Sequence, residues 1–183
     1  TVLPGERKQI ELPLPHLYTH SHMSMPVHVI HGRRPGPRLF VSAAIHGDEI
    51  NGVEIIRRLL HTKTLNSLKG TLIAVPVVNV FGFIHKSRYL PDRRDLNRSF
   101  PGFERGSLAG QIAHLFMEEI VARCTHGIDL HTAASGRTNL PQIRADLEDS
   151  PELKDMACAF NSPVVLNAPL RDGSLRGVAK EYD

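Results

Sequence analysis

The chain has 183 residues, of which 41% are apolar, and its formal net charge is +3. This composition supports one sizeable hydrophobic core, so we expect a single domain. Apolar runs stop far short of the roughly 20 residues that cross a bilayer, so the sequence predicts neither a membrane span nor an export signal. Cys124 and Cys158 lack a C-x-x-C spacing, which favours unpaired thiols and a cytoplasmic location.

Arginine supplies 16 of the 22 basic residues. Because a guanidinium group binds carboxylates and phosphates well, an anionic partner is expected. Nucleic acid is disfavoured, because the basic pairs are dispersed along the chain, Trp is absent and aromatic side chains are few. The sequence leaves a homo-oligomer open.

The first part of the chain alternates strands and helices. The predicted strands, in order, are Ile10–Leu12 within a proline-rich segment, Val27–His31, and the buried strands Pro37–Ile45 and Thr71–Val78. Between the two buried strands, the sequence predicts a helix at Glu49–His61. One face of this helix carries Ile50, Val53, Ile56 and Leu60.

The second part continues this alternation after an aperiodic segment, residues 79–106, which by its length predicts a functional loop. It predicts a helix at Ser107–Ala122 with Leu108, Ile112, Leu115 and Phe116 inward, strands at His126–Thr132, Gln142–Ala145 and Pro163–Asn167, and helices at Pro151–Phe160 and from Ser174 onward. Nearly continuous apolar strands joined by helices indicate a three-layer α/β/α fold with a mostly parallel or mixed central sheet.

A histidine and a glutamate follow the strand that ends at Ile45. In "AAIHGDE", Gly47 permits a sharp turn, and His46 and Glu49 lie at the carboxyl end of the strand, where α/β sheets bind ligands. An imidazole and a carboxylate suit zinc. About 0.6 such H-x-x-E matches are expected by chance, as the similar spacing in His126–Asp129 illustrates, so a helix cap is an alternative interpretation.

A third candidate ligand follows a different strand. In "IDLHT", His131 has the same kind of strand-end position as His46, so the three side chains predict one metal site. A hydrogen bond at the rim of the sheet is the alternative role for His131. The histidines of "HLYTHSH", namely His16, His20 and His22, are expected on the surface.

Three motifs in this order, "HGDE", "DLNRSFPG" and "DLHT", resemble the succinylglutamate desuccinylase/aspartoacylase family, whose members are zinc-dependent deacylases related to zinc carboxypeptidases. The segment "VVLNAPLRDGSLRGVAKEYD" also resembles the part of bacterial members that precedes their last catalytic strand. The resemblance implies that residues 1–183 form a single, C-terminally truncated zinc-carboxypeptidase-like catalytic domain, with residues 1–35 as an edge segment.

The same resemblance implies roles for individual residues. One zinc ion per chain would be bound by the three ligands described above, and Asp95 would orient His46. Arg88 would polarise the scissile carbonyl and hold the developing oxyanion, with Arg93 and Arg94 as rivals for this role. Asn97 and Arg98 would grip the substrate carboxylate. A solvated charged loop is the alternative interpretation, and it is favoured for Arg93 and Arg94 rather than for this pair.

The family's general base, a glutamate in an E-x-G context, is expected beyond Asp183. We expect the protein to hydrolyse the amide bond of an N-acyl amino acid or a similar small molecule with a carboxylate. A zinc carboxypeptidase acting on peptides and a metal-binding protein without turnover are the alternatives. The sequence does not specify the acyl group or the amine, and the metal is zinc by ligand type alone.

Overall fold

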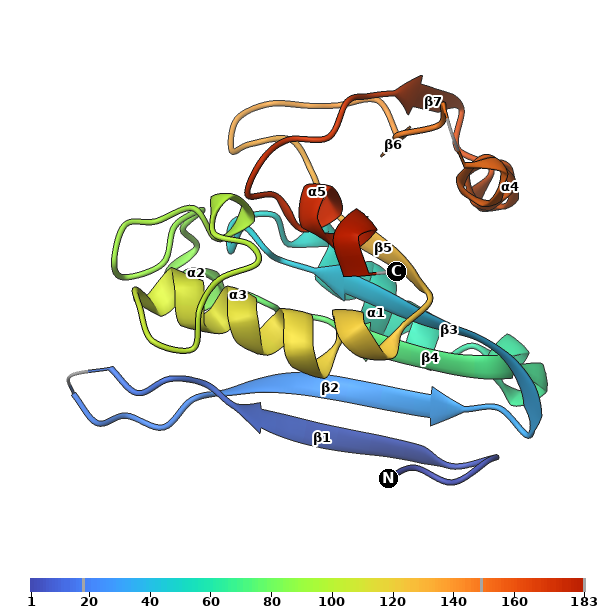
Figure 1. Ribbon diagram of the computed structural model, residues 1–183, viewed down its shortest axis with the longest axis horizontal. Helices are drawn as coiled ribbons and strands as arrows, with labels where there is room; N and C mark the ends of the chain where they lie inside the picture. The colour runs from blue at the N-terminus through green and yellow to red at the C-terminus, as the bar shows by residue number, and fades with distance from the viewer. Residues whose placement is uncertain (18, 149, 183) are drawn as a thin grey trace.

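The computed structural model describes residues 1–17, 19–148 and 150–182, and it contains two β-sheets. The central sheet has five strands in the order β1-β2-β4-β3-β5 (Figure 1). Its strands are β1 (Arg7–Pro13), β2 (Ser24–His31), β3 (Arg34–Ala43), β4 (Lys69–Val75) and β5 (His126–Leu130).

The central sheet is mixed. Strands β1 and β2 form an antiparallel hairpin, and β2 is antiparallel to β4. Strand β3 lies between β4 and β5 and is parallel to both, with Ala43 opposite Leu130 at the carboxyl ends of β3 and β5. The residues that follow these two strands therefore emerge at the same edge of the sheet.

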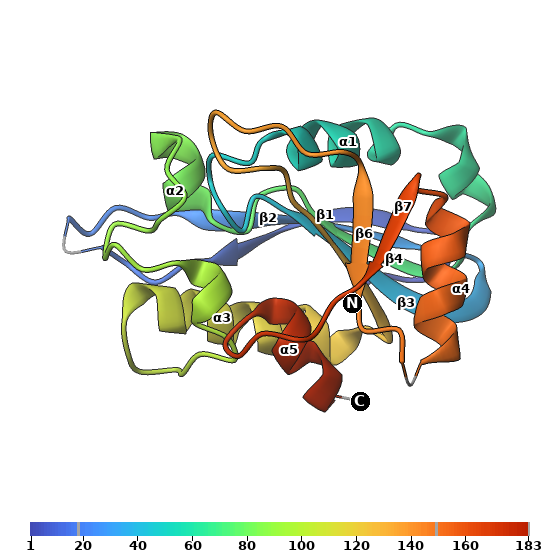
Figure 2. The ribbon, with the colours of Figure 1, turned by 90° about the horizontal axis from the view of Figure 1, so that it is seen from above.

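Helices cover both faces of this sheet, as Figure 2 shows. Helix α1 (Asn51–Leu60) lies on one face, and α3 (Leu108–Glu119) and α5 (Leu175–Ala179) lie on the other. Side chains that alternate along a strand point to opposite faces. Phe40 of β3 accordingly packs in the α3 core with Phe116, whereas Val41 packs in the α1 core with Ile56. The predicted three-layer α/β/α fold with a mixed central sheet is confirmed.

A second, two-stranded parallel sheet lies apart from the central one (Figure 1). It pairs β6 (Gln142–Ala145) with β7 (Val164–Asn167), and α4 (Pro151–Phe160) connects them. The predicted strands are present, but they do not extend the central sheet within the described residues. The side chains of β7 are accordingly more exposed than those of β3.

Two local predictions were wrong. Ile50 is 54% exposed rather than on the buried face, because α1 begins at Asn51 and Ile50 is its N-cap. Segment 79–106 is not wholly irregular, since it contains α2 (Val80–His85) and a short 3₁₀ helix at Leu96–Arg98. A six-residue helix is too short to show a helical repeat of apolar residues.

The last predicted helix is present as α5, with a 3₁₀ turn at Lys180–Tyr182 after it; Asp183 lies outside the described residues. Among the helices of the described segments, none combines the length and the apolar character that crossing a bilayer requires.

Adjacent residues on α1 provide a matched test of this packing. Ile56 is fully buried between α1 and the sheet, whereas Ile55 is 53% exposed. Ile56→Ala should lower the free energy of unfolding by about 2–5 kcal/mol, because it leaves a cavity. Ile55→Ala should change it by less than about 0.5 kcal/mol. Urea denaturation followed by circular dichroism measures both values, and equal losses would contradict the packing described.

Candidate metal centre

The turn after β3 carries the first two predicted ligands. The backbone bends at Ala44, which has a left-handed φ of 52°, and the N–H of Asn79 donates to the Ala44 carbonyl. The expected turn is present at Gly47 and Asp48, where the N–H of Glu49 donates to the His46 carbonyl, although Gly47 does not adopt a left-handed backbone. It is required for space, since a Cβ there would lie 2.0 Å from the carbonyl carbon of Gly82 in α2. The turn therefore packs directly on α2, which holds His46 and Glu49 in place.

The three predicted metal ligands converge. One ligand atom from each of His46, Glu49 and His131 lies within 4.8 Å of the others. Glu49 links the two imidazoles, with Oε1 2.7 Å from His46 Nδ1 and Oε2 2.8 Å from His131 Nδ1. In the described segments, this is the only group of three such side chains that could hold a metal ion. Two imidazoles and one carboxylate fit zinc with an open fourth position.

Charge in this cluster is strongly coupled. Burial favours the neutral form of Glu49, but hydrogen bonds from His131 and His46 outweigh it and hold the Glu49 pKa far below its usual range. Burial likewise favours neutral His131, yet the charge of Asp129 and a hydrogen bond to it, together with Glu49, raise the His131 pKa to about 10. Without metal, a protonated imidazole thus lies between two carboxylates. A metal cation would supply the positive charge that this proton supplies.

Asp95 connects the cluster to the loop of residues 79–106. Its Oδ1 lies 3.1 Å from His46 Nε2, the nitrogen that faces away from Glu49. Its Oδ2 accepts hydrogen bonds from Arg88 Nε at 3.2 Å and Nη2 at 2.9 Å. Arg88 Nη1 also lies 3.4 Å from Glu49 Oε1. The structure therefore brings together Arg88, Asp95 and the three predicted ligands, as the sequence analysis expected.

The rival arginines lie on the exposed part of the same loop. Arg93 is exposed, and Arg94 lies 4.0 Å from Asp92 with a 64% exposed side chain. Arg88, by contrast, is 30% exposed and contacts two carboxylates of the cluster, those of Glu49 and Asp95.

Asn97 and Arg98 follow directly after Asp95. The Asn97 N–H donates to Asp95 Oδ1 at 2.9 Å, and the Asn97 Oδ1 accepts the N–H of Leu175 in α5 at 3.0 Å. Arg98 is exposed, and its guanidinium donates to the carbonyl of Asn97. Asn97 is thus fixed beside the cluster, while most of the Arg98 fork faces solvent. The substrate-binding role of this pair stays a prediction.

Sequence reasoning missed two residues that contact this cluster. Asp129 Oδ2 lies 2.6 Å from His131 Nε2, and Ser42 donates from Oγ to Asp129 Oδ1 at 2.8 Å. Asp129 entered the sequence-based prediction only as part of a chance match with His126. The signal that could have found it is its spacing of two residues from His131, because alternate residues on a strand share a face.

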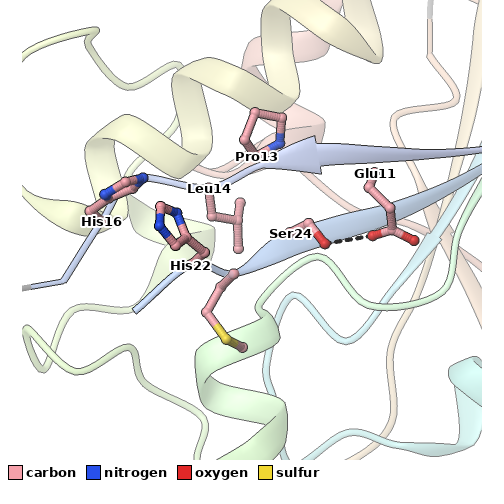
Figure 3. A pocket seen from close by; sticks show the side chains of 7 residues that line it. Glu11, Pro13, Leu14, His16, His22 and Ser24 are labelled. Carbon is pink, nitrogen blue, oxygen red and sulfur yellow. Dashed lines mark hydrogen bonds between the residues drawn. The ribbon is translucent and has the colours of Figure 1, made fainter. Parts of the chain in front are cut away.

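The histidines of the β1–β2 hairpin form a separate feature. The rings of His16 and His22 meet edge to face with centroids 4.5 Å apart, in a pocket that Glu11 and Ser24 also line (Figure 3). His16, His20 and His22 are exposed, as predicted, and none belongs to the group of potential metal ligands found in the described residues.

Comparison with known proteins identifies the class. Residues 35–182 match the family model of the succinylglutamate desuccinylase/aspartoacylase catalytic domain. The chain belongs to this family, and the resemblance found in its motifs is confirmed.

Individual relatives agree with this assignment. An N-alpha-acetyl-L-2,4-diaminobutyric acid deacetylase from Halomonas elongata is 29% identical over 147 residues, which are 78% of this chain and 43% of that protein. A product-bound ectoine utilization protein from Ruegeria pomeroyi matches with a TM-score of 0.79 and 26% identity, over 98% of this chain and 59% of its own.

A succinylglutamate desuccinylase/aspartoacylase from Rhodobacter sphaeroides has the same fold, with a TM-score of 0.82 at 24% identity. The match covers 96% of this chain and 54% of the Rhodobacter protein. The chain thus spans about half the length of these relatives.

The raised pKa of His131 predicts how the stability of the metal-free protein depends on pH. With a pKa of about 10 in the folded state and about 6.5 when unfolded, protonated His131 stabilises the fold fully below pH 6.5. This contribution should be lost as the pH rises toward 10. Urea denaturation between pH 6.5 and 10 should show a steeper decline for the wild type than for His131→Asn. Parallel profiles would contradict the charge arrangement described here.

Proposed function

We propose that the protein is a zinc-dependent deacylase that hydrolyses the amide bond of an N-acyl amino acid or a similar small anionic amide. The observation that carries this proposal is the convergence of His46, Glu49 and His131 beside Arg88, in a chain of the desuccinylase/aspartoacylase family. The deacetylase from Halomonas elongata, whose name states an N-acetylated amino acid substrate, supports the substrate class.

In this proposal, His46 and His131 bind the metal through Nδ1 and Glu49 binds it through its carboxylate. A bound zinc ion lowers the pKa of its water and withdraws electrons from a carbonyl, and an unactivated amide needs both effects. Glu49 is ready for this role as a carboxylate, since its neighbours hold its pKa low.

Arg88 would stabilise the negative charge that develops on the scissile carbonyl oxygen. Its guanidinium is oriented by Asp95 and Glu49, at 2.9 Å and 3.4 Å respectively. A donor held in place in this way needs little reorganisation during the reaction, which is the condition for strong electrostatic stabilisation.

Asn97 and Arg98 would bind the carboxylate of the substrate. The N–H of Leu175 occupies Oδ1 of Asn97, so the amide NH₂ is the group left to donate toward a ligand. The exposed Arg98 fork can bind a carboxylate through two N–H groups. Together they explain why the substrate should be an anion.

The reaction also needs a group that takes the proton from water. The family resemblance predicts a glutamate in an E-x-G context for this step. The metal itself can be tested on this chain.

The proposed function first predicts the metal content of the protein. The purified wild-type protein should contain about one zinc ion per chain by inductively coupled plasma mass spectrometry, because three ligands converge on one point. Glu49→Ala and His131→Ala should each lose it. His85→Ala, which changes an exposed histidine of α2, should keep it. A wild type that takes up no zinc, even when zinc is supplied, would overturn the proposed function.

Substrate recognition is the second prediction. In the zinc-loaded full-length enzyme, Arg98→Ala should raise KM for an N-acetyl amino acid by about 10- to 100-fold, because one charged hydrogen-bonding partner is lost. Arg94→Ala, a change to an exposed arginine of the same loop, should leave KM within about twofold. Equal effects of the two variants would remove Arg98 from the substrate site. Faster cleavage of peptides with a free C-terminus would favour a carboxypeptidase instead.

A further inference from the structure

His131 is the least buried of the three candidate metal ligands. His46 and Glu49 have side chains only 5% and 3% exposed, so packing holds them. The His131 side chain is 34% exposed and follows the last residue of β5 at the rim of the sheet. The His131 ring is thus less enclosed than the side chains of His46 and Glu49. Hydrogen bonds at its two nitrogens therefore contribute more to its orientation.

Asp129 lies against one of these nitrogens, Nε2 of His131. Its Oδ2 lies 2.6 Å from His131 Nε2, while His131 Nδ1 faces Glu49 at 2.8 Å. A nitrogen that binds a metal must offer a lone pair, so the ring proton has to be on the other nitrogen. An acceptor at Nε2 therefore favours the tautomer whose Nδ1 can bind metal. The same pattern is found at His46, where Asp95 faces Nε2 and Glu49 faces Nδ1.

Asp129 is in turn held by the neighbouring strand. Ser42 of β3 and Asp129 of β5 are directly opposite in the parallel ladder, and Ser42 Oγ donates to Asp129 Oδ1 at 2.8 Å. Ser42 is fully buried, and the Asp129 side chain is only 17% exposed. The two carboxylate oxygens of Asp129 thus have separate partners, Ser42 at Oδ1 and His131 at Oδ2. The ladder of backbone hydrogen bonds keeps this row of three side chains in line.

We propose that Asp129, held by Ser42, is the positioning residue that orients His131 and selects its metal-binding tautomer. This inference rests on the proposed function, because it requires a metal at the cluster. It extends that function by tying the affinity for the metal to a buried hydroxyl of β3, on a residue that is not one of the three candidate ligands.

The test compares zinc affinities, measured by competition with a chromophoric chelator. Asp129→Asn keeps the size of the side chain but replaces the carboxylate, and it should weaken zinc binding by about 10-fold or more. Ser42→Ala should weaken it by less than about 10-fold, since Asp129 keeps its contact with His131. Asp155→Asn and Ser67→Ala, the same changes at exposed positions, should leave the affinity within about twofold.

A double variant separates positioning from a general loss of stability. If Ser42 acts through Asp129, adding Ser42→Ala to Asp129→Asn should cause no further loss of affinity. The visible spectrum of the cobalt-loaded protein should also change in Asp129→Asn, because it reports ligand geometry. Independent, additive losses together with an unchanged cobalt spectrum would indicate a structural role only and would overturn the proposal.

The outcomes for this inference and for the proposed function differ. A wild type that binds neither zinc nor cobalt overturns the metal centre itself. A wild type that binds zinc tightly, beside an Asp129→Asn variant of equal affinity and identical cobalt spectrum, overturns only the role of Asp129 and Ser42.

Discussion

The buried carboxylate of Glu49 is the interaction on which the rest of the site depends. It is 3% exposed, and it faces His46, His131 and Arg88 while accepting the backbone N–H of Thr132. A buried carboxylate without such partners would be neutral rather than charged. The partners come from three separate segments of the sequence, so the charged state of this one residue requires the correct assembly of the whole sheet edge.

The sheet provides that assembly because β3 and β5 are parallel neighbours. Their carboxyl ends meet, which brings residues 85 positions apart, His46 and His131, to ring centroids 5.0 Å apart. The loop of residues 79–106 then closes the cluster from one side through Asp95 and Arg88. The candidate metal centre and the fold are thus linked by a single geometric fact, the adjacency of two strand ends.

The same adjacency explains the two carboxylates behind the histidines. Asp95 comes from the loop and Asp129 from β5 itself, yet each faces the Nε2 of one imidazole. Both histidines then present Nδ1 to Glu49. Two different segments therefore produce one chemical arrangement. In each of the two histidines, Nε2 faces an aspartate and Nδ1 is directed at Glu49.

The sequence by itself determined the alternation of elements, the three-layer class, the family and the candidate ligands, because these depend on local apolar patterns and short motifs. It predicted the buried face of α1 except at Ile50, because the predicted start of the helix, Glu49, lies two residues before the actual start at Asn51. Only the tertiary structure decided that Gly47 serves close contact with α2, that β6 and β7 form a separate sheet, and that Ser42 and Asp129 support His131. Each of these depends on which distant strands and helices become neighbours, and no local pattern records that choice.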